Sequence, residues 1–208
     1  MLLALRRVWS SSISFGLCAD LSGLPAARPA RIAMRMEPQD PASFTGFDDE
    51  LERVSGVGRV EVADRQRLCA AGVATLYAAV DDSGMPIYAQ WLIRRHEQEP
   101  LHRRTHGLFP QLGETEALVE GAYTFMNFRR LGAMADGMRQ LLVQSRDAGD
   151  RRVFTYVAED NVPSLRGCAN VGFILDHLRY DRRRLGVRRV RRVPPDAASK
   201  ARWAAAVA

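Results

Sequence analysis

The stretch Ala117-Leu-Val-Glu-Gly-Ala-Tyr-Thr-Phe125, followed by Phe128-Arg-Arg-Leu-Gly-Ala-Met134, decides how the rest of this sequence is interpreted. The first part is apolar and predicts a buried strand. The second part is a Gly-containing turn with two arginines, after which apolar residues recur at helical spacing up to Gly149. A strand that enters a helix through a tight turn leaves free backbone N–H groups at the positive end of the helix dipole. The stretch therefore predicts an anion site, with Arg129 and Arg130 as added cations.

The chain after this helix predicts a second strand, a helix and a closing pair of strands. Arg152–Ala158 is apolar and β-compatible. Asn161 is a good N-cap for a helix that ends at Val171, with a proline in its first turn. Phe173–Tyr180 and Leu185–Val193 can form an antiparallel pair. Because a helix joins the first two strands, we expect them to be parallel, with a right-handed crossover.

The chain before the deciding stretch predicts two helices and a hairpin. Phe47–Val54 and Arg59–Ala71 favour helices, and the strands Val73–Val80 and Pro86–Ile93 flank a turn of composition Asp-Asp-Ser-Gly. Residues 94–113 are polar and contain a proline, so we expect a solvated loop there.

Metal and membrane sites are not indicated. The histidines of residues 94–113 are His96, His102 and His106, and their spacing matches no metal-ligand motif. No segment approaches the ~20 apolar residues that cross a bilayer. The three cysteines are scattered and odd in number, so a reducing, cytoplasmic location fits best.

The charge of +6 comes from the two ends of the sequence. Residues 1–33 hold four arginines and one acid, and residues 182–192 hold seven arginines and no acid, so the remainder is net acidic. This distribution argues against a nucleic-acid binder, whose basic residues cover a folded face. The strand at 182–192 has two interpretations. It could face an acidic partner such as an acyl carrier protein, or it could be a solvated edge strand guarded by charge.

The first 33 residues are predicted to lie outside the fold. They are basic and rich in serine, as a targeting segment is, although a bacterial signal peptide fits poorly. An over-called start, with Met34 or Met36 as the initiator, is the alternative that we favour, since an acidic composition begins at Glu37. We therefore expect one domain over residues 34–195 and an Ala-rich tail over residues 196–208.

Two motifs identify a family resemblance. Arg129-x-x-Gly132-x-Met134 resembles the Gln/Arg-x-x-Gly-x-Gly/Ala signature of the GNAT acyltransferases, and Met134 departs from it. Asn161-Val-Pro-Ser-Leu-Arg followed by Gly172-Phe173 resembles the second recurrent stretch of that family. The resemblance implies an α/β fold with a mixed, mostly antiparallel sheet, helices on both faces, and a splayed parallel strand pair that holds acyl-CoA.

The resemblance also implies which residues bind the acyl donor. The backbone amides of the turn would hold the pyrophosphate of coenzyme A, the end of the preceding strand would pair with the pantetheine amides, and the second motif would lie near the pantetheine arm. The implied donor-binding residues are Tyr123, Thr124, Phe125, Arg129, Arg130, Leu131, Gly132, Ala133, Met134, Asn161 and Ser164.

Catalysis needs a base for the amine and a proton for the departing thiolate. Glu120 stands where many members of the family carry a base, although a Glu there could also simply pair with an arginine. Cys168 stands where many members carry a tyrosine acid. A thiol could donate a proton, but a lone cysteine is more often a small buried hydrophobe, so Tyr123 or Tyr180 could supply the acid, or none is required.

The resemblance implies transfer of an acyl group, with acetyl favoured, from acyl-CoA to a small-molecule amine or amino-acid acceptor. The amine attacks directly, and no metal, nucleic acid or membrane takes part; a homodimer stays open. Two alternatives stay open as well. One is a non-catalytic module that binds acyl-CoA. The other is a synthase of N-acyl amino acids or lactones that takes longer chains from a carrier protein, which a wide apolar tunnel beside Phe125 would mark.

Overall fold

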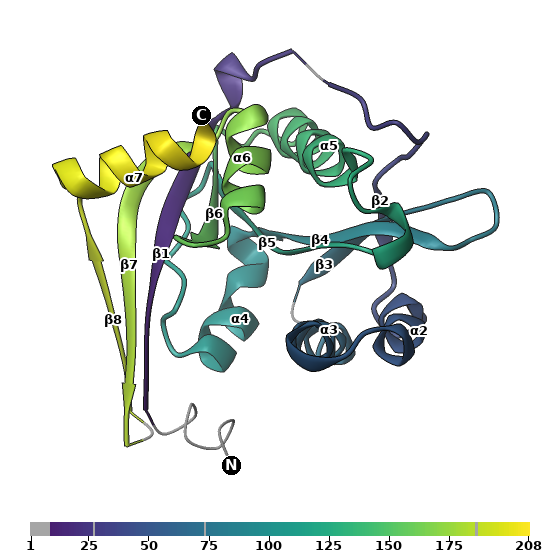
Figure 1. Cartoon of the computed structure of the whole chain (residues 1–208), viewed down its shortest axis with the longest axis horizontal. Coiled ribbons are helices and arrows are strands. Elements are labelled where there is room, and N and C mark those ends of the chain that lie inside the picture. Colours follow the sequence, from purple (N-terminus) through teal and green to yellow (C-terminus); the bar gives the residue numbers. More distant parts are fainter. Residues whose placement is uncertain (1–8, 27, 73, 186) are drawn as a thin grey trace.

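A single sheet of eight strands organises the part of the chain that the computed structural model describes, residues 9–26, 28–72, 74–185 and 187–208. The strand order is β2-β3-β4-β5-β6-β1-β7-β8 (Figure 1). All neighbouring strands are antiparallel except β5 and β6, which are parallel, as predicted. The strands are β1 Trp9–Asp20, β2 Glu37–Gln39, β3 Thr75–Val80, β4 Pro86–Arg94, β5 Glu116–Thr124, β6 Arg152–Ala158, β7 Ile174–Arg184 and β8 Val187–Val193.

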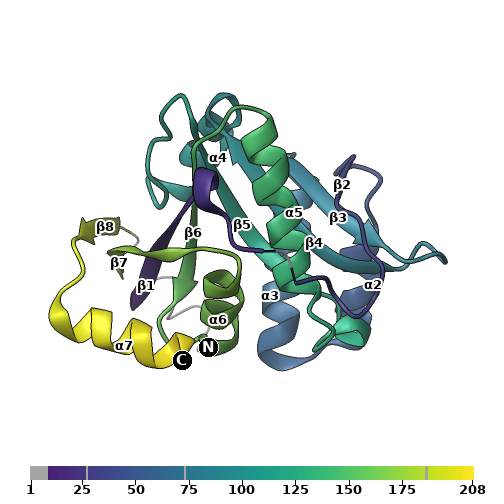
Figure 2. The same cartoon turned by 90° about the horizontal axis from the view of Figure 1, so that it is seen from above.

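Helices cover both faces of the sheet, so the predicted α/β architecture is confirmed (Figures 1 and 2). We call the face covered by α5, α6 and α7 the upper face and the face covered by α2, α3 and α4 the lower face. Each face has its own apolar core, because side chains alternate between the two sides of a strand. The α-helices are α2 Gly46–Arg53, α3 Gly56–Ala70, α4 Gln98–Thr105, α5 Ala133–Asp147, α6 Val162–Asn170 and α7 Ala197–Val207.

Most of the predicted elements are present. The hairpin is β3 and β4, although Val73 lies outside the described residues, and the closing pair is β7 and β8. Asn161 caps α6 as predicted, since its side chain accepts a hydrogen bond from the Ser164 N–H. The expectation of a solvated loop over residues 94–113 is wrong in part, because α4 lies there. The buried Leu101 anchors α4 to the lower core.

The expectation that residues 1–33 lie outside the fold is wrong for β1. This strand lies between β6 and β7 and pairs with both. Phe15, Leu17 and Ala19 are fully buried in the upper core, and the alternate residues Ser14 and Gly16 face the lower side. The segment belongs to the sheet because large apolar and small side chains alternate along it, which is the pattern of a strand covered on both faces.

The Ala-rich tail is also part of the folded unit. Residues 197–207 form α7, and the Asp196 side chain caps its first turn by accepting from the Ser199 N–H at 2.7 Å. Trp203 packs edge-on against Phe15, and Ala206 is buried in the upper core. The small alanine side chains let this helix approach α6 closely. The predicted domain limits of 34–195 therefore exclude β1, which belongs to the sheet, and α7, which packs on it.

A chain that begins at Met34 tests the place of β1. We expect it to lose the cooperative thermal unfolding transition of the full chain, because β6 and β7 would each lose their hydrogen-bonding partner across the middle of the sheet. Circular dichroism against temperature measures this. A chain that begins at Trp9 keeps β1 and serves as the control, and it should retain the transition. Equal melting of all three chains would contradict the assignment of β1.

We predict that packing against His177 requires a glycine at position 16. A Cβ at this position would lie 2.4 Å from the Nε2 of His177, whose ring crosses β1 at this point. We expect Gly16→Ala to lower the free energy of unfolding by about 1–3 kcal/mol, as overpacking does. Urea denaturation measures the loss. Gly23→Ala is the matched control, because nothing lies within 4 Å of a Cβ there. A Gly16→Ala protein as stable as the control would refute the close contact.

Candidate functional site

The two parallel strands β5 and β6 separate partway along their length (Figure 2). Their register joins three residue pairs and ends at Leu118 and Phe154. Each strand then continues, β5 to Thr124 and β6 to Ala158. From this point the facing backbone groups of the two strands no longer pair with each other. A polar backbone edge of this kind can bind an extended ligand as an added strand.

A β-bulge in β5 marks the point of separation. Trp91 of β4 faces Glu120 and Ala89 faces Tyr123, so one β4 residue stands opposite two residues of β5. One of those two is Gly121, which has a φ of 69° and whose missing Cβ would lie 2.6 Å from the Trp91 ring. Glycine meets both demands. A bulge bends the strand that carries it, which accounts for the divergence of β5 from β6.

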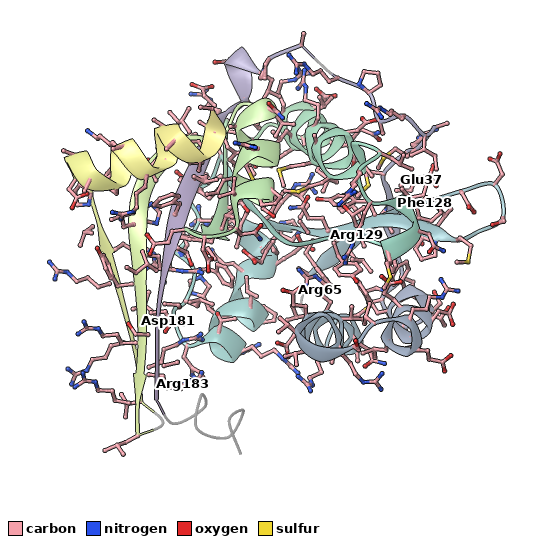
Figure 3. All side chains as sticks on the ribbon, viewed as in Figure 1. Glu37, Arg65, Phe128, Arg129, Asp181 and Arg183 are labelled. Atoms are coloured by element: carbon pink, nitrogen blue, oxygen red, sulfur yellow. The ribbon has the colours of Figure 1, made fainter. Side chains whose placement is uncertain are left out.

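Arg65 of α3 occupies the lower side of the split (Figure 3). Its Nε donates to the Gly121 carbonyl oxygen at 3.0 Å, and its Nη2 donates to that of Ala122 at 2.9 Å. The guanidinium also lies over the Tyr123 ring, 5.0 Å from its centroid. Arg65 therefore satisfies two carbonyl groups at the bulge and holds α3 against the opened sheet.

A cleft of about 120 Å³ lies in the split. Of the residues predicted from sequence, Glu120, Met134, Asn161, Ser164 and Cys168 line it. The other predicted residues do not line it. The cleft is completed by residues that were not predicted: Arg65, Gly121, Ala122, Met138, Thr155, Tyr156, Val157 and Ala158. The structure thus brings together the second sequence motif and the base candidate at one place.

Glu120 is an unpaired acid at the point where the strands part. Its Oε2 is buried and has no hydrogen-bond partner among the described residues. Burial raises the pKa of Glu120 above its usual value, and the charges of Arg179 and Arg65 oppose this shift together with the Gly121 N–H. No ion pair within 4.0 Å involves Glu120 in the described part of the chain. A buried carboxyl with a raised pKa is suited to accept a proton near neutral pH.

Cys168 is the fully buried wall of the cleft on the upper face. Burial, with a smaller effect of Glu120, raises the pKa of Cys168 to about 12. Its thiol lies 3.9 Å from the sulfur of Met138, within the apolar core. This environment matches the small buried hydrophobe that was the second interpretation of this residue.

The turn before α5 carries free backbone N–H groups. Among the described residues, no hydrogen bond is donated by the backbone N–H of Arg130, Leu131, Gly132, Ala133 or Met134. Arg130 has a φ of 65° and Gly132 a φ of 86°, so the turn is tightly wound where it enters the helix. These N–H groups stand at the positive end of a 15-residue helix. The geometry is that of an anion site.

The two arginines of this turn behave differently. Arg129 folds back on the strand end, where its Nη2 lies 3.3 Å from the Tyr123 hydroxyl and its Nε 3.3 Å from the Thr124 carbonyl oxygen. Arg130 is exposed and has no hydrogen bond or ion pair in the described structure. Arg130 is therefore the side chain of the two that is free to meet a ligand.

The segment between β1 and β2 packs across the same turn. The Arg31 N–H donates to the Leu131 carbonyl oxygen at 2.7 Å, and the Ala30 N–H donates to the Asp136 carboxylate at 2.7 Å. A Cβ on Gly132 would lie 3.4 Å from the Ala30 Cα. The sequence did not predict this contact, because residues 1–33 were expected outside the fold.

The remaining donor-binding candidates lie around the end of β5. The side chains of Tyr123 and Phe125 are buried in the lower core, so a role for these residues depends on their backbone. Glu50 of α2 accepts from the Tyr123 hydroxyl at 2.8 Å and from the Met126 N–H at 2.9 Å. The Phe125 N–H already donates to the Ile87 carbonyl oxygen. The strand end is therefore rigidly held from the lower face.

Met134 closes the upper side of the split. A Cβ at Gly167 would lie 3.2 Å from the Met134 Cε, so the thioether packs against α6. Asn161 and Ser164 begin α6 beside it and are linked by the cap hydrogen bond. Since a methionine side chain is flexible, Met134 can adopt other rotamers when a ligand enters.

A larger groove of about 680 Å³ lies elsewhere, between residues 35–38 and α5. It lacks the diverging strand edges and the unpaired buried carboxyl of the split. We therefore base the site on the smaller cleft. Among the described residues, no group of three or more His, Cys, Asp or Glu side chains is placed to hold a metal ion. None of the described helices is both long and apolar enough to span a bilayer.

Comparisons with known proteins give a result for the fold. No protein-family model matches this sequence, and no curated protein matches it by sequence. Solved structures do match. The glucosamine N-acetyltransferase region of a fungal multi-domain GH3 β-N-acetylglucosaminidase gives a TM-score of 0.60 at 13% identity, over 85% of this chain and 21% of that chain.

Two bacterial structures agree with that result. A GNAT-family acetyltransferase from Colwellia psychrerythraea gives a TM-score of 0.55 at 14% identity, over 86% of this chain and 58% of that chain. A GCN5-related N-acetyltransferase from Sphaerobacter thermophilus gives 0.52 at 14% identity, over 93% of this chain and 56% of that chain. The chain spans less than two thirds of the length of each of the three. With its split parallel pair and its free turn before α5, this chain has the fold of the GNAT acetyltransferases.

Proposed function

We propose that this protein is an acyltransferase that moves a short acyl group from acyl-CoA to an amine. The observation that carries the proposal is the split between β5 and β6, with a turn of free backbone N–H groups at one end and the unpaired Glu120 inside it. Acyl transfer to an amine requires both features, one to bind the donor and one to accept the amine proton. The shared fold with acetyltransferases supports the same reaction class.

The donor would bind across the upper side of the split. Its pyrophosphate would accept hydrogen bonds from the free N–H groups of residues 130–134, with Arg130 as an added cation. Its pantetheine arm would then run between Met134 and the start of α6. These assignments combine the resemblance of the two motifs with the positions that the residues occupy.

The transfer would proceed by direct attack. The amine nitrogen bonds to the thioester carbonyl carbon, the carbon–sulfur bond breaks, and Glu120 takes the proton that the nitrogen loses, directly or through water. The thiolate leaves with the sulfur electron pair and takes a proton from solvent or from a nearby acid. The raised pKa of Cys168 and its apolar surroundings make it a poor proton donor. Cys168 therefore does not act as the acid in this mechanism, contrary to its predicted role.

A short acyl group is favoured by the space beside Phe125. A cavity of about 10 Å³ lies next to this residue, which is room for one water molecule at most. Phe125 is stacked on Phe47, with ring centroids 5.6 Å apart. A cavity of this size is not the wide tunnel that would mark a carrier-protein-dependent synthase. The small-molecule acceptor and the cytoplasmic location stay predictions.

Glu120→Gln tests the base. We expect kcat for acetylation of a good acceptor to fall roughly 100-fold or more, because a general base contributes that much and the amide cannot take the proton. Because burial raises the pKa of Glu120, the wild-type kcat/KM should rise with pH through a limb that lies above the usual glutamate range. That limb should vanish in the variant. Steady-state rates from pH 5 to 9 with acetyl-CoA measure both effects.

The alternative of a non-catalytic acyl-CoA-binding module is distinguished by the same assay. Unchanged turnover in Glu120→Gln would remove Glu120 as the base and leave the reaction class standing. If wild-type protein binds acetyl-CoA but acetylates no amine, the enzyme proposal itself fails. Glu61→Gln is the control for loss of an acidic side chain, because this exposed residue on α3 lies outside the cleft.

Gly132→Ala tests the donor site. Its φ of 86° strains any L side chain, so the turn should shift and its N–H groups should lose their common direction. We expect the Kd for acetyl-CoA to rise about tenfold, as loss of a charge-assisted hydrogen bond would produce. Calorimetric titration with acetyl-CoA and desulfo-CoA measures this.

Gly149→Ala is the matched control for that titration. Gly149 has a φ of 99° and follows the other end of α5, with nothing within 4 Å of a Cβ. It reproduces the backbone strain away from the proposed donor site. Equal loss of affinity in the two variants would mean that the turn has no specific role, and absence of binding to wild type would remove the donor assignment.

A further inference from the structure

Arg179 of β7 carries buried hydrogen-bond donors that the described protein does not satisfy. Its Nε and Nη1 are buried and have no hydrogen-bond partner among the described residues, whereas its Nη2 donates to the Ser14 hydroxyl at 3.2 Å. Burial lowers the pKa of Arg179. Leaving such groups buried and unpaired is unfavourable, and more so for charged groups. An arginine in this state is suited to a ligand that supplies the missing acceptors.

The guanidinium is held in place by stacking. Its Cζ lies 4.1 Å from the centroid of the Tyr156 ring and 5.6 Å from that of Phe109. Such cation–π contacts fix the plane of the group without using its N–H donors. The fork of Arg179 is therefore already oriented before a ligand arrives.

The Tyr156 ring is fixed in turn by a contact across β1. Its hydroxyl lies 3.1 Å from the His177 Nε2, and the His177 Nδ1 lies 2.8 Å from the Asp176 carboxylate. The His177 ring reaches Tyr156 over Gly16, where a side chain would block it. Neighbours in the sheet thus build a platform under Arg179, which a loosely held surface arginine would lack.

An unpaired acid lies on the same face of the sheet. Glu120 of β5 has a buried oxygen without a partner, and its charge acts on Arg179. The two groups are not joined by an ion pair within 4.0 Å. In the strand order, Tyr156 of β6 lies between them, and it lines the cleft together with Glu120. One unpaired negative group and one unpaired positive group therefore flank the same aromatic ring.

Three other arginines near this face already donate to acceptors. Arg65 donates to two carbonyl oxygens, Arg188 is paired with Asp181 at 2.7 Å, and Arg192 donates to the Gly107 and Leu108 carbonyl oxygens. Arg139 also has unpartnered N–H groups, but it lies on α5, on the upper face beside the groove at residues 35–38. Arg179 is thus, within the described part of the chain, a cation of the lower face with open donors, and the charge of Glu120 acts on it.

We propose that Arg179 binds a carboxylate of the acceptor, so that the acceptor is an amine carrying a carboxylate, as an α-amino acid does. This inference rests on the proposed function. The two free N–H groups of a guanidinium match the two oxygens of a carboxylate, while the amine of the same molecule is directed toward Glu120. Such a zwitterion neutralises both unpaired groups at once, which an amine without a carboxylate does not.

The first test compares acceptors on the wild-type protein and needs no variant. Acetyl-CoA turnover is followed by release of the free thiol, with L-amino acids, their carboxamides, a polyamine and an aminoglycoside as acceptors. For at least one amino acid we expect kcat/KM to exceed that of its own carboxamide by roughly 100-fold, because a buried charged donor left unpaired is costly. Equal rates for the acid and its carboxamide would overturn the inference and leave the acyltransferase intact.

The second test removes the guanidinium of Arg179. Arg179→Met keeps much of the length of the side chain and removes the charge, so we expect KM for the preferred amino acid to rise roughly 100-fold while the slow rate with its carboxamide stays the same. Arg182→Met is the matched control, since Arg182 is exposed on the same strand. A purely structural role would lower both rates together, which would overturn the inference.

A third variant keeps the inference testable if Arg179→Met does not fold. Ser14→Ala removes the Nη2 partner and leaves the guanidinium in place, so it should raise KM for the amino acid by a smaller factor, with the melting temperature as the check on folding. If Arg179→Met does not fold, an unchanged KM for the amino acid in Ser14→Ala would contradict the proposed role of Arg179. If no acceptor of either kind is acetylated, the proposed function fails and the inference fails with it.

Discussion

The site depends on the loss of backbone pairing between β5 and β6 beyond Leu118. Two strands inside a sheet normally satisfy each other, and an unpaired buried edge is costly. Here the bulge at Gly121 bends β5 away from its neighbour and turns two carbonyl groups toward the gap. The divergence creates the cleft and also leaves hydrogen-bonding groups inside it. Side chains of the protein bind some of those groups, and the others stay free for a ligand.

Only some of the hydrogen-bonding groups around the opened strand edge have partners. On the lower face Arg65 binds the carbonyl oxygens of Gly121 and Ala122, and Glu50 fixes the end of β5 through Tyr123. At the start of α5 the free N–H groups stay without partners. The satisfied groups make the cleft rigid, while the unsatisfied ones are where binding energy is available. Preorganised donors in a partly buried site bind an anion more strongly than the same groups in water.

Local sequence signals predicted the elements that local interactions form. The apolar run at 117–125, the Gly132 turn and the Asn161 cap act within a few residues, and each element was found where it was expected. The site residues on these elements, Glu120 and Met134 among them, were found in the cleft for the same reason. Cys168 lies in the cleft wall as well, and it is buried, as expected for a lone cysteine that acts as a small hydrophobe.

Contacts between distant segments were not predictable in this way. Ile13, Phe15 and Leu17 alternate with small residues, which is a strand signal. The strand pairs, however, with residues about 130 to 175 positions away, and it lies within a basic, serine-containing segment that suggested a different origin. Arg179 precedes a run of arginines in which a solvated edge was the natural expectation. Its stacking on Tyr156 and its bond to Ser14 both come from other strands.

The position of β1 connects the two features that the sequence did not predict, the strand itself and the contacts of Arg179. Because β1 separates β6 from β7, a side chain on β7 can approach the cleft only by crossing a residue of β1. Gly16 and Ser14 are the residues crossed, and their small size lets His177 reach Tyr156 and lets Arg179 lie over its ring. A side chain at Gly16 would clash with the His177 ring, and the small Ser14 is the residue that the Arg179 guanidinium contacts on β1. The small residues Ser14 and Gly16 therefore let Arg179 and His177 of β7 reach Tyr156, which lines the cleft. The N-terminal strand thus shapes the surroundings of the cleft as well as the sheet.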